Sequence, residues 1–306
     1  MRRRATTPAP ETGAPAPHER PGWVDDELYP FTSRFLDVDG HVVHHVDEGR
    51  GPVLLMLHGN PTWSFLHRRA IAGLRTDHRC IAVDLPGFGL STAAPGYTST
   101  PEEHAEVVRA LVTRLDLHDV TLVTHDWGGP IGLDAATRDP DRYARVVVAN
   151  TWAWPLRGGL RLEVFSRLMG GPLGRFLVRR FNLFVTAGIP RGHHRRRPDE
   201  AEMQHYRDAL GTPERRLGSS VLPGAFVRSR PFLRELAGRL HVLADLPTLV
   251  VWGDRDADLG EPELERWRRL RPTADVVVLH DVGHYLQSDA PEEYLAALRG
   301  WLRATG

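Results

Sequence analysis

The chain has 306 residues, 41% of them hydrophobic, which is enough to bury one large core together with an inserted subdomain. Its 39 basic residues, all arginine, balance 39 acidic ones, so no global field attracts nucleic acid or an anionic membrane. No stretch reaches the roughly 18 consecutive apolar residues that a membrane helix requires. The composition therefore predicts a globular protein without a nucleic-acid or membrane partner.

The N-terminal segment, residues 1–22, is rich in Pro, Ala and Thr and has no apolar run of the kind found in secretory signals. It is predicted to be a disordered tail. The single cysteine, Cys80, lies in an apolar run and cannot form an intrachain disulfide. It is interpreted as a buried structural thiol. Together these features predict a cytoplasmic protein.

Short apolar segments recur from Phe31 onward. Between Phe31 and Glu48, two alternating segments flank Asp39-Gly40, a dipeptide suited to a tight type I′ hairpin turn. Further apolar runs lie at 53–57, 80–84, 121–125, 145–150, 248–252 and 275–280. Runs without polar alternation, separated by helical segments, indicate a parallel sheet covered on both faces. The sequence thus predicts an α/β fold with a mostly parallel, eight-stranded sheet flanked by helices.

Two helices have recognisable starts. Thr100 can cap a helix in which Pro101 takes the first turn and Glu103 completes a capping box. A second helix is predicted to begin at Ala290-Pro291 and to close the last layer of the sheet.

The alternation of strands and helices breaks once, between Asn150 and about Leu246, where helical patterns continue without a convincing strand. We expect a helical cap over residues 151–246, inserted into a core formed by residues 23–150 and 247–306. The predicted cap helices cover residues 160–169, 174–185, 199–210 and 230–240.

The segment Thr124-His125-Asp126-Trp127-Gly128-Gly129 follows an apolar strand and precedes a helical pattern, which is the setting of a nucleophile elbow. Its central residue is Asp126, where serine hydrolases have serine. A carboxylate nucleophile forms an ester that must then be hydrolysed at the enzyme's own carbonyl group. Asp126 could instead cap the following helix, since a carboxylate is favourable at a helix N-terminus.

An acid and a base follow Asp126 in the chain order that this kind of fold requires. Asp256 lies just after the strand at 248–252, and His284 lies just after the strand at 275–280. The carboxyl ends of parallel strands open on one edge of a sheet, so both residues should lie near Asp126. His284 can act as a general base that Asp256 orients. Asp254, two residues earlier, is a competing acid.

A fourth signal is His58-Gly59-Asn60-Pro61-Thr62-Trp63, directly after the strand at 53–57. The backbone N–H groups of Asn60 and Trp127 can form an oxyanion hole. The Asn60 amide and the Trp127 indole add N–H donors for an anion. Asparagine is also common in turns and tryptophan in cores, so either residue alone would be a weak signal.

Five segments together resemble the haloalkane dehalogenases of the α/β-hydrolase superfamily over about residues 28–304: HGNPTWSFLHR, VDLPGFGLS, VTHDWGG, WGDRD and GHYLQSDAPEE. The resemblance implies an α/β-hydrolase fold with an inserted helical cap. It also implies that Asp126 is the nucleophile, His284 the base and Asp256 the acid, and that Asn60 and Trp127 hold the departing halide. The implied activity is hydrolysis of carbon–halogen bonds through a covalent alkyl-Asp126 ester.

Some branches of this family place the acid after the preceding strand. The matching position here is Asn150, which cannot act as an acid and so favours Asp256. The branch with Asn, Trp and the later Asp also resembles the β-lactone decarboxylases of long-chain olefin biosynthesis. NTWAWPL and GPLGRFLVRRFNLF are similar to the start of their caps. β-Lactone decarboxylation therefore stays open as an alternative, because attack by Asp on a lactone's alkyl carbon uses the same residues.

Two other functions fit the sequence less well. Epoxide hydrolases use two tyrosines of the cap, whereas the predicted cap contains only Tyr206. A non-catalytic ligand receptor would not need Asp126, Asp256, His284 and Asn60 together.

No metal or organic cofactor is expected, since the sequence has no H-E-x-x-H motif and His193-His194 lie beside three arginines. The expected partners are a small apolar substrate, water and a halide ion, while assembly into a homo-oligomer is left open. Six hydrophobic cap residues are candidate walls of the substrate pocket: Phe176, Leu177, Phe181, Phe184, Leu222 and Pro223.

Overall fold

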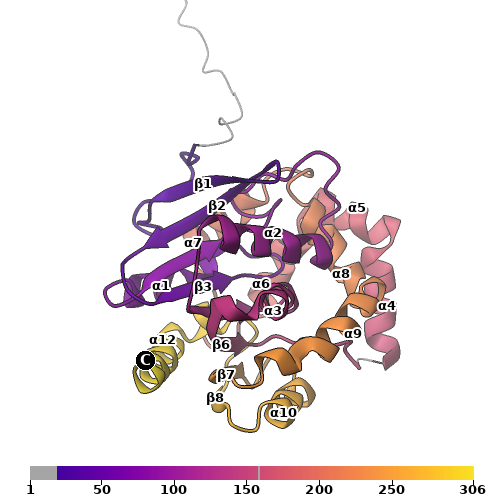
Figure 1. Ribbon diagram of the computed structural model, residues 1–306. Helices are drawn as coiled ribbons and strands as arrows, with labels where there is room; N and C mark the ends of the chain where they lie inside the picture. Colours follow the sequence, from indigo (N-terminus) through magenta and orange to yellow (C-terminus); the bar gives the residue numbers. More distant parts are fainter. Residues whose placement is uncertain (1–18, 158) are drawn as a thin grey trace, which may run out of the picture.

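The computed structural model describes residues 19–157 and 159–306, so most of the predicted tail at 1–22 lies outside the described residues. One sheet of eight strands has the order β1-β2-β4-β3-β5-β6-β7-β8 (Figure 1). The strands are β1 (Ser33–Val38), β2 (His41–Glu48), β3 (Val53–Leu57), β4 (Arg79–Val83), β5 (Val120–His125), β6 (Tyr143–Ala149), β7 (Thr248–Gly253) and β8 (Asp275–Leu279). Only the β1–β2 and β2–β4 pairs are antiparallel. The predicted, mostly parallel sheet is confirmed.

The hairpin at the start of the sheet has the predicted turn. Asp39 and Gly40 have φ angles of 52° and 85°, the left-handed values that a type I′ turn requires at both central positions. The turn places Val38 opposite His41 and sets the register of the whole β1–β2 pair.

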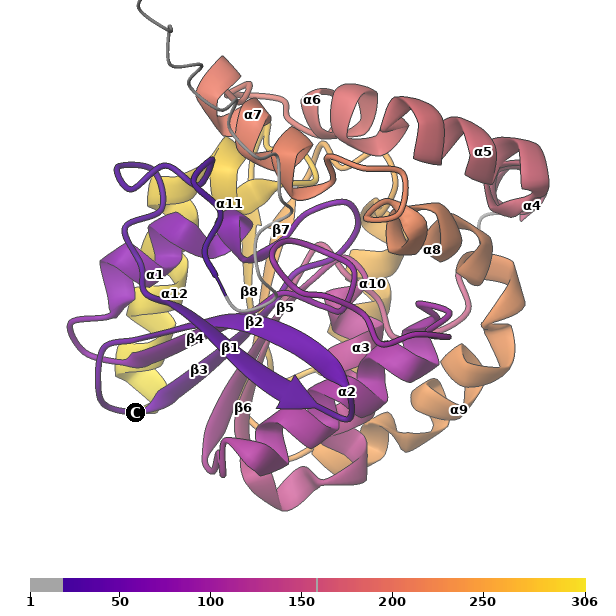
Figure 2. The same ribbon diagram turned by 90° about the horizontal axis from the view of Figure 1, so that it is seen from above.

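Helices cover both faces of the sheet (Figure 1, Figure 2). On one face lie α1 (Arg68–Leu74), α11 (Leu286–Asp289) and α12 (Pro291–Thr305), and on the other lie α2 (Pro101–Arg114), α3 (Gly128–Arg138) and α10 (Glu261–Leu270). The predicted capping box at the start of α2 is present, because Thr100 Oγ1 accepts from the Glu103 N–H and the Glu103 carboxylate accepts from the Thr100 N–H, both at 3.3 Å.

The central strands β5 and β7 are buried along their whole length, since helices cover both of their faces. The strands from β3 onward all run parallel, so they end at the same sheet edge, and the loops that follow them there carry polar residues. Asn60 follows β3, Asp126 follows β5, Asp256 follows β7 and His284 follows β8. The parallel topology therefore gathers residues that are up to 224 positions apart in the sequence.

Between β6 and β7 the described residues form helices and no strand, which confirms the helical insertion. Its helices are α4 (Gly159–Gly170), α5 (Pro172–Phe181), the π-helix η3 (Phe184–Gly188), α6 (Ile189–Arg191), α7 (Glu200–Ala209), α8 (Leu217–Arg228), α9 (Arg230–Arg239) and the 3-10 helix η4 (Leu240–Leu243). No helix in the described part of the chain is both long and apolar enough to cross a membrane.

One predicted helix of the insertion is interrupted. The prediction of a single helix over 174–185 is wrong, because α5 ends at Phe181 and Asn182 adopts a left-handed conformation with φ 53°. Asparagine tolerates this conformation at a helix end, and its side chain donates to the Leu210 carbonyl oxygen at 3.2 Å. The chain then continues as the π-helix η3.

Helix α8 has no counterpart among the predicted helices. Its sequence contains Gly218, Pro223 and Gly224, three residues that disfavour a helix interior. Tertiary packing overrides that preference, because a Cβ on Gly170 of α4 would lie 2.4 Å from the Gly224 Cα. The glycines let the two helix backbones approach closely, and Ser166 Oγ donates to the Gly224 carbonyl oxygen at 3.2 Å.

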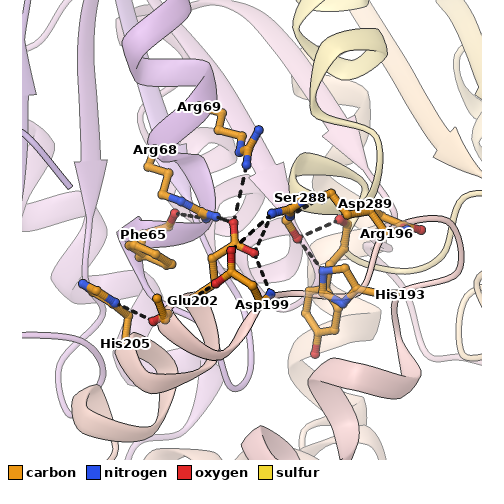
Figure 3. A network of polar contacts seen from close by, with 12 residues as sticks. Phe65, Arg68, Arg69, His193, Arg196, Asp199, Glu202, His205, Ser288 and Asp289 are labelled. Atoms are coloured by element: carbon orange, nitrogen blue, oxygen red, sulfur yellow. Dashed lines mark hydrogen bonds and ion pairs between the residues drawn. The ribbon is translucent and has the colours of Figure 1, made fainter. Parts of the chain in front are cut away.

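A buried carboxylate joins the insertion to the core (Figure 3). Glu202 of α7 is 1% exposed and forms an ion pair with Arg68 of α1, which is 4% exposed. Arg196 donates to the second Glu202 oxygen at 2.8 Å. Burial alone would raise the pKa of Glu202, but Arg68 and Arg196 lower it below its usual value.

Glu202→Ala should therefore lower the free energy of unfolding by about 3–5 kcal/mol, because Arg68 would stay buried without its counter-charge. Urea unfolding of the purified variant measures the loss. The control is Glu200→Ala on the same helix, whose side chain is 85% exposed in its ion pair with Arg207. Equal stability of Glu202→Ala and the control would contradict the role of this ion pair.

Candidate active site

Asp126 occupies a strained turn between β5 and α3. Its φ is 49°, a left-handed value that costs a non-glycine residue energy and is common at functional sites. Two glycines make room for the turn: a Cβ on Gly59 would lie 2.0 Å from Asp126 Oδ1, and a Cβ on Gly128 would lie 2.5 Å from the Leu57 carbonyl oxygen. The arrangement is the strand-turn-helix geometry expected of a nucleophile elbow.

Asp126 is 8% exposed, and its carboxylate is held by backbone donors. The Asn60 N–H donates to Oδ1 at 2.7 Å. Burial raises the pKa of Asp126 to about 6, although the charge of His284 and the backbone N–H groups of Trp127 and Asn60 lower it. Both predicted oxyanion donors thus act on the carboxylate of Asp126 itself.

His284 faces the other carboxylate oxygen. Its Nε2 lies 3.6 Å from Asp126 Oδ2, which is longer than a direct hydrogen bond. Its Nδ1 donates to Asp256 Oδ2 at 2.7 Å. Burial alone would lower the pKa of His284, but the charge and hydrogen bond of Asp256, together with the charge of Asp126, raise it to about 9.

The structure places Asp256, and not Asp254, on His284. Asp256 is 7% exposed, and its Oδ1 also accepts from the backbone N–H groups of Asp258 and Leu259 at 2.9 and 3.1 Å. Asp254 is exposed and instead contacts His280 Nδ1 at 3.0 Å. The two carboxylates therefore point to different histidines.

Asn150 contributes to the site in a way that the sequence did not reveal. Its Nδ2 donates to Asp256 Oδ2 at 2.7 Å, and its Oδ1 accepts from the Gly253 N–H at 2.8 Å. It is fully buried with φ 38°. Asn150 thus fixes the carboxylate of Asp256, which orients His284. The sequence signal for this role was that a polar residue, Asn150, ends the apolar run at 145–150.

Two further buried groups hold the loop of His284. His125 Nε2 donates to the His284 carbonyl oxygen at 2.9 Å, while burial and the charge of His284 keep the pKa of His125 well below its usual value. Asp289 accepts from the Gly283 N–H at 2.7 Å. The same Asp289 carboxylate accepts from the backbone N–H groups of residues 194–196 at 2.7–2.9 Å. The insertion and the His284 loop therefore share one anchor, which lies close to the Glu202 contacts in Figure 3.

Asn60 and Trp127, whose backbone N–H groups act on Asp126, also carry side-chain donors without a partner among the described residues. In the described part of the chain, neither the Asn60 Nδ2 nor the Trp127 indole N–H forms a hydrogen bond with another group. The Asn60 backbone N–H donates to the Asp126 carboxylate, and Trp127 directly follows Asp126 in the sequence. Unpaired donors on residues that adjoin a buried nucleophile can stabilise a departing anion.

Two aromatic rings pack against the Trp127 indole. Trp152 and Phe226 lie with ring centroids 4.8 and 5.0 Å from it. Phe226 belongs to α8, the helix that the sequence did not predict, so this residue was missed for the same reason. Through it the insertion supplies an apolar wall beside the predicted anion donors.

The six predicted pocket residues are dispersed over the insertion. Phe176 and Phe181 are 60% and 51% exposed on α5, so the prediction that they wall a buried pocket conflicts with their position. Leu177 and Phe184 are half-buried, while Leu222 and Pro223 are buried in α8. Of the six, only the α8 pair belongs to the helix that reaches Trp127.

The comparisons with known proteins agree with this fold. The family profile described as alpha/beta hydrolase fold matches residues 52–291. The chain is 40% identical over 276 residues to haloalkane dehalogenase 2 of Mycobacterium tuberculosis, covering 90% of this chain and 96% of the relative. It is 32% identical over 293 residues to the cis-3-alkyl-4-alkyloxetan-2-one decarboxylase of Shewanella oneidensis, covering 92% and 91%. The crystal structure of haloalkane dehalogenase DatA from Agrobacterium tumefaciens C58 matches with a TM-score of 0.81 at 26% identity, covering 90% and 97%.

Asp256→Asn should lower turnover by roughly three to four orders of magnitude, because His284 loses the carboxylate that orients it and stabilises its charged form. Asp254→Asn is the matched control, since Asp254 contacts His280 instead. Steady-state kinetics of the two folded variants compare them. A larger loss for Asp254→Asn would reverse the assignment of the acid.

Proposed function

The chain belongs to the α/β-hydrolase fold family and, within it, to the haloalkane dehalogenases, and from this premise we propose that it hydrolyses haloalkanes to an alcohol and a halide. The observation that carries the proposal is the buried Asp126 carboxylate, held by the backbone N–H groups of Asn60 and Trp127, two residues whose side-chain donors have no partner in the described part of the chain. No metal or organic cofactor has a part in the proposed reaction. The proposal also places the enzyme in the cytoplasm, which the free, buried Cys80 supports.

The first step is an in-line displacement by Asp126 Oδ2. Oδ1 is held by the Asn60 N–H, so Oδ2 is the oxygen left to attack. A bond forms from Oδ2 to the substrate carbon while the carbon–halogen bond breaks, and the halide leaves with the electron pair. The Asn60 amide and the Trp127 indole donate to that anion in a site largely closed to water, where such contacts are stronger.

The second step is hydrolysis of the alkyl ester. The gap of 3.6 Å between His284 Nε2 and Asp126 Oδ2 lies beside the carbonyl carbon that water must attack. His284 takes a proton from water, the resulting hydroxide adds to Cγ, and the backbone N–H groups of Asn60 and Trp127 stabilise the oxyanion on Oδ1. Collapse breaks the bond between Cγ and the ester oxygen, and His284 returns its proton to the departing alcohol.

Ester formation itself prepares the base. In the free enzyme the charges of Asp256 and Asp126 hold the pKa of His284 at about 9, so the imidazole is protonated at neutral pH. The alkyl ester of Asp126 carries no charge. The pKa of His284 therefore falls once the intermediate forms, because one of the two carboxylates that raise it has been neutralised. The base becomes available in the step that needs it.

A second candidate function is β-lactone decarboxylation. A relative that covers 92% of the chain is named a cis-3-alkyl-4-alkyloxetan-2-one decarboxylase, and an oxetan-2-one is a β-lactone. Asp126 would attack the alkyl carbon of the ring with a carboxylate as leaving group. The Asn60 amide and the Trp127 indole would then donate to that carboxylate. Epoxide hydrolysis has less support, because among the described residues of the insertion Tyr206 is the one tyrosine and it is 2% exposed.

Parallel product analysis distinguishes these functions. The protein is incubated with bromoalkanes of several chain lengths and with dialkyl β-lactones, and bromide, alcohol, alkene and CO2 are measured. Bromide and alcohol in equal amounts support the proposal. Alkene and CO2 from the lactones, without bromide from any bromoalkane, would replace it with decarboxylation. No product from either panel would leave a ligand-binding role.

His284→Gln should trap the intermediate, because alkylation of Asp126 needs no base whereas ester hydrolysis does. With a bromoalkane we expect about one equivalent of bromide in a fast phase, followed by arrest. Intact-mass analysis should show one added alkyl group that maps to Asp126, and Asp126→Ala is the matched control that should release no bromide. An absence of both bromide and added mass in His284→Gln would contradict in-line displacement.

The rate of the bromide burst should fall as the pH drops through about 6, because Asp126 attacks only as a carboxylate and burial raises its pKa to about 6. His284 carries a charge that lowers this pKa, so in His284→Gln the midpoint should move to higher pH. Rapid-quench measurements of the burst across the pH range record both midpoints. A burst rate independent of pH down to about 4.5 would contradict a buried carboxylate nucleophile.

A further inference from the structure

The outermost helices of the insertion carry an exposed apolar surface. Figures 1 and 2 both place α4 and α5 at the edge of the molecule. Six large hydrophobic side chains on these helices are each more than half exposed: Leu160, Val164, Leu168, Leu173, Phe176 and Phe181. We call this surface the α4–α5 face. Clustered exposure of this kind marks an interaction site, whereas single exposed hydrophobics need no explanation.

The spacing of the side chains accounts for their exposure. Leu160, Val164 and Leu168 follow one another at intervals of four residues and form a stripe along one side of α4. On the opposite side, Ser166 and Gly170 pack against α8. The packing of α4 against α8 therefore leaves the stripe on the side of α4 that faces away from α8.

An arginine-rich hollow lies between α5 and α8, and Phe176 of the α4–α5 face is one of its walls. It has a volume of about 670 Å3, and its walls include Phe176, Arg175, Arg179, Arg180 and Arg228. No carboxylate lines it, and within the described residues none of these four arginines forms an ion pair with an acid. Burial and the charges of Arg228 and Arg179 lower the pKa of Arg175.

The charge imbalance is local. From Gly159 to Phe181 there are five arginines and one acid, Glu163, which already pairs with Arg167 and Arg230. The net charge of zero for the whole chain hides this excess. A positively charged hollow without acidic partners, close to exposed leucines and phenylalanines, is complementary to a partner whose outer layer is anionic and whose interior is apolar.

We propose that the α4–α5 face docks on an anionic phospholipid bilayer, with lipid phosphates in the arginine hollow and the exposed apolar side chains among the acyl chains. Amphipathic helices with arginine on the polar side and Leu or Phe on the other bind membranes in this way. A symmetric second copy fits less well, because it would bring two uncompensated arginine groups together. The proposal does not depend on the reaction that Asp126 performs.

Vesicle flotation tests the proposal with the full chain. The protein should float with phosphatidylcholine vesicles that contain phosphatidylglycerol and remain unbound with phosphatidylcholine alone. Arg175→Gln/Arg179→Gln/Arg180→Gln should weaken the partitioning roughly a hundredfold. Leu168→Ser/Leu173→Ser should also weaken it, and these exposed substitutions keep the test valid if the arginine variant does not fold.

A matched control removes the same charge elsewhere. Arg34→Gln/Arg50→Gln/Arg269→Gln alters three exposed arginines outside the insertion and should bind vesicles as the wild type does. Equal loss in this control would show general charge attraction and overturn the proposal. Failure of the wild type to float, or full release by millimolar inorganic phosphate, would overturn it as well. A dimer that Leu168→Ser/Leu173→Ser converts to a monomer would assign the face to a second copy.

Discussion

The desolvated carboxylate of Asp126 is the constraint on which the rest of the site depends. A buried charge is unfavourable, and so is a left-handed aspartate, yet the turn between β5 and α3 imposes both. Backbone N–H groups from two different loops and the charge of His284 offset part of that cost. The sheet edge supplies all three, because parallel strands bring their following loops to one place.

The support extends outward in successive contacts. His284 is oriented by Asp256, Asp256 is held by Asn150, and the loop of His284 is anchored by Asp289. Asp289 also binds the backbone of residues 194–196 in the insertion. The insertion is thus attached to the loop that carries the base, and its position and the orientation of His284 depend on one carboxylate.

The sequence was sufficient wherever a short local pattern determines the structure. The strands, the Asp39-Gly40 turn, the capping box at Thr100 and the elbow each depend on residues within a few positions of one another. It was insufficient for α8, whose glycines and proline disfavour a helix until α4 packs against it. The bridging role of Asn150 was missed because its partner, Asp256, lies 106 positions away. The roles assigned to Asp126, Asp256, His284, Asn60 and Trp127 remain predictions.

Helix α8 connects two surfaces with opposite chemistry. Phe226 lies against Trp127, next to the proposed halide donors, while Arg228 lines the arginine hollow and donates to the Gly170 carbonyl oxygen of α4. These two residues are only two positions apart on α8, so one helix supplies both the wall of the hollow and the ring beside Trp127. The close backbone contact at Gly170 and Gly224 leaves α4 and α8 little freedom to move separately. The face proposed to meet a bilayer and the aromatic wall beside Trp127 are therefore joined through one helix.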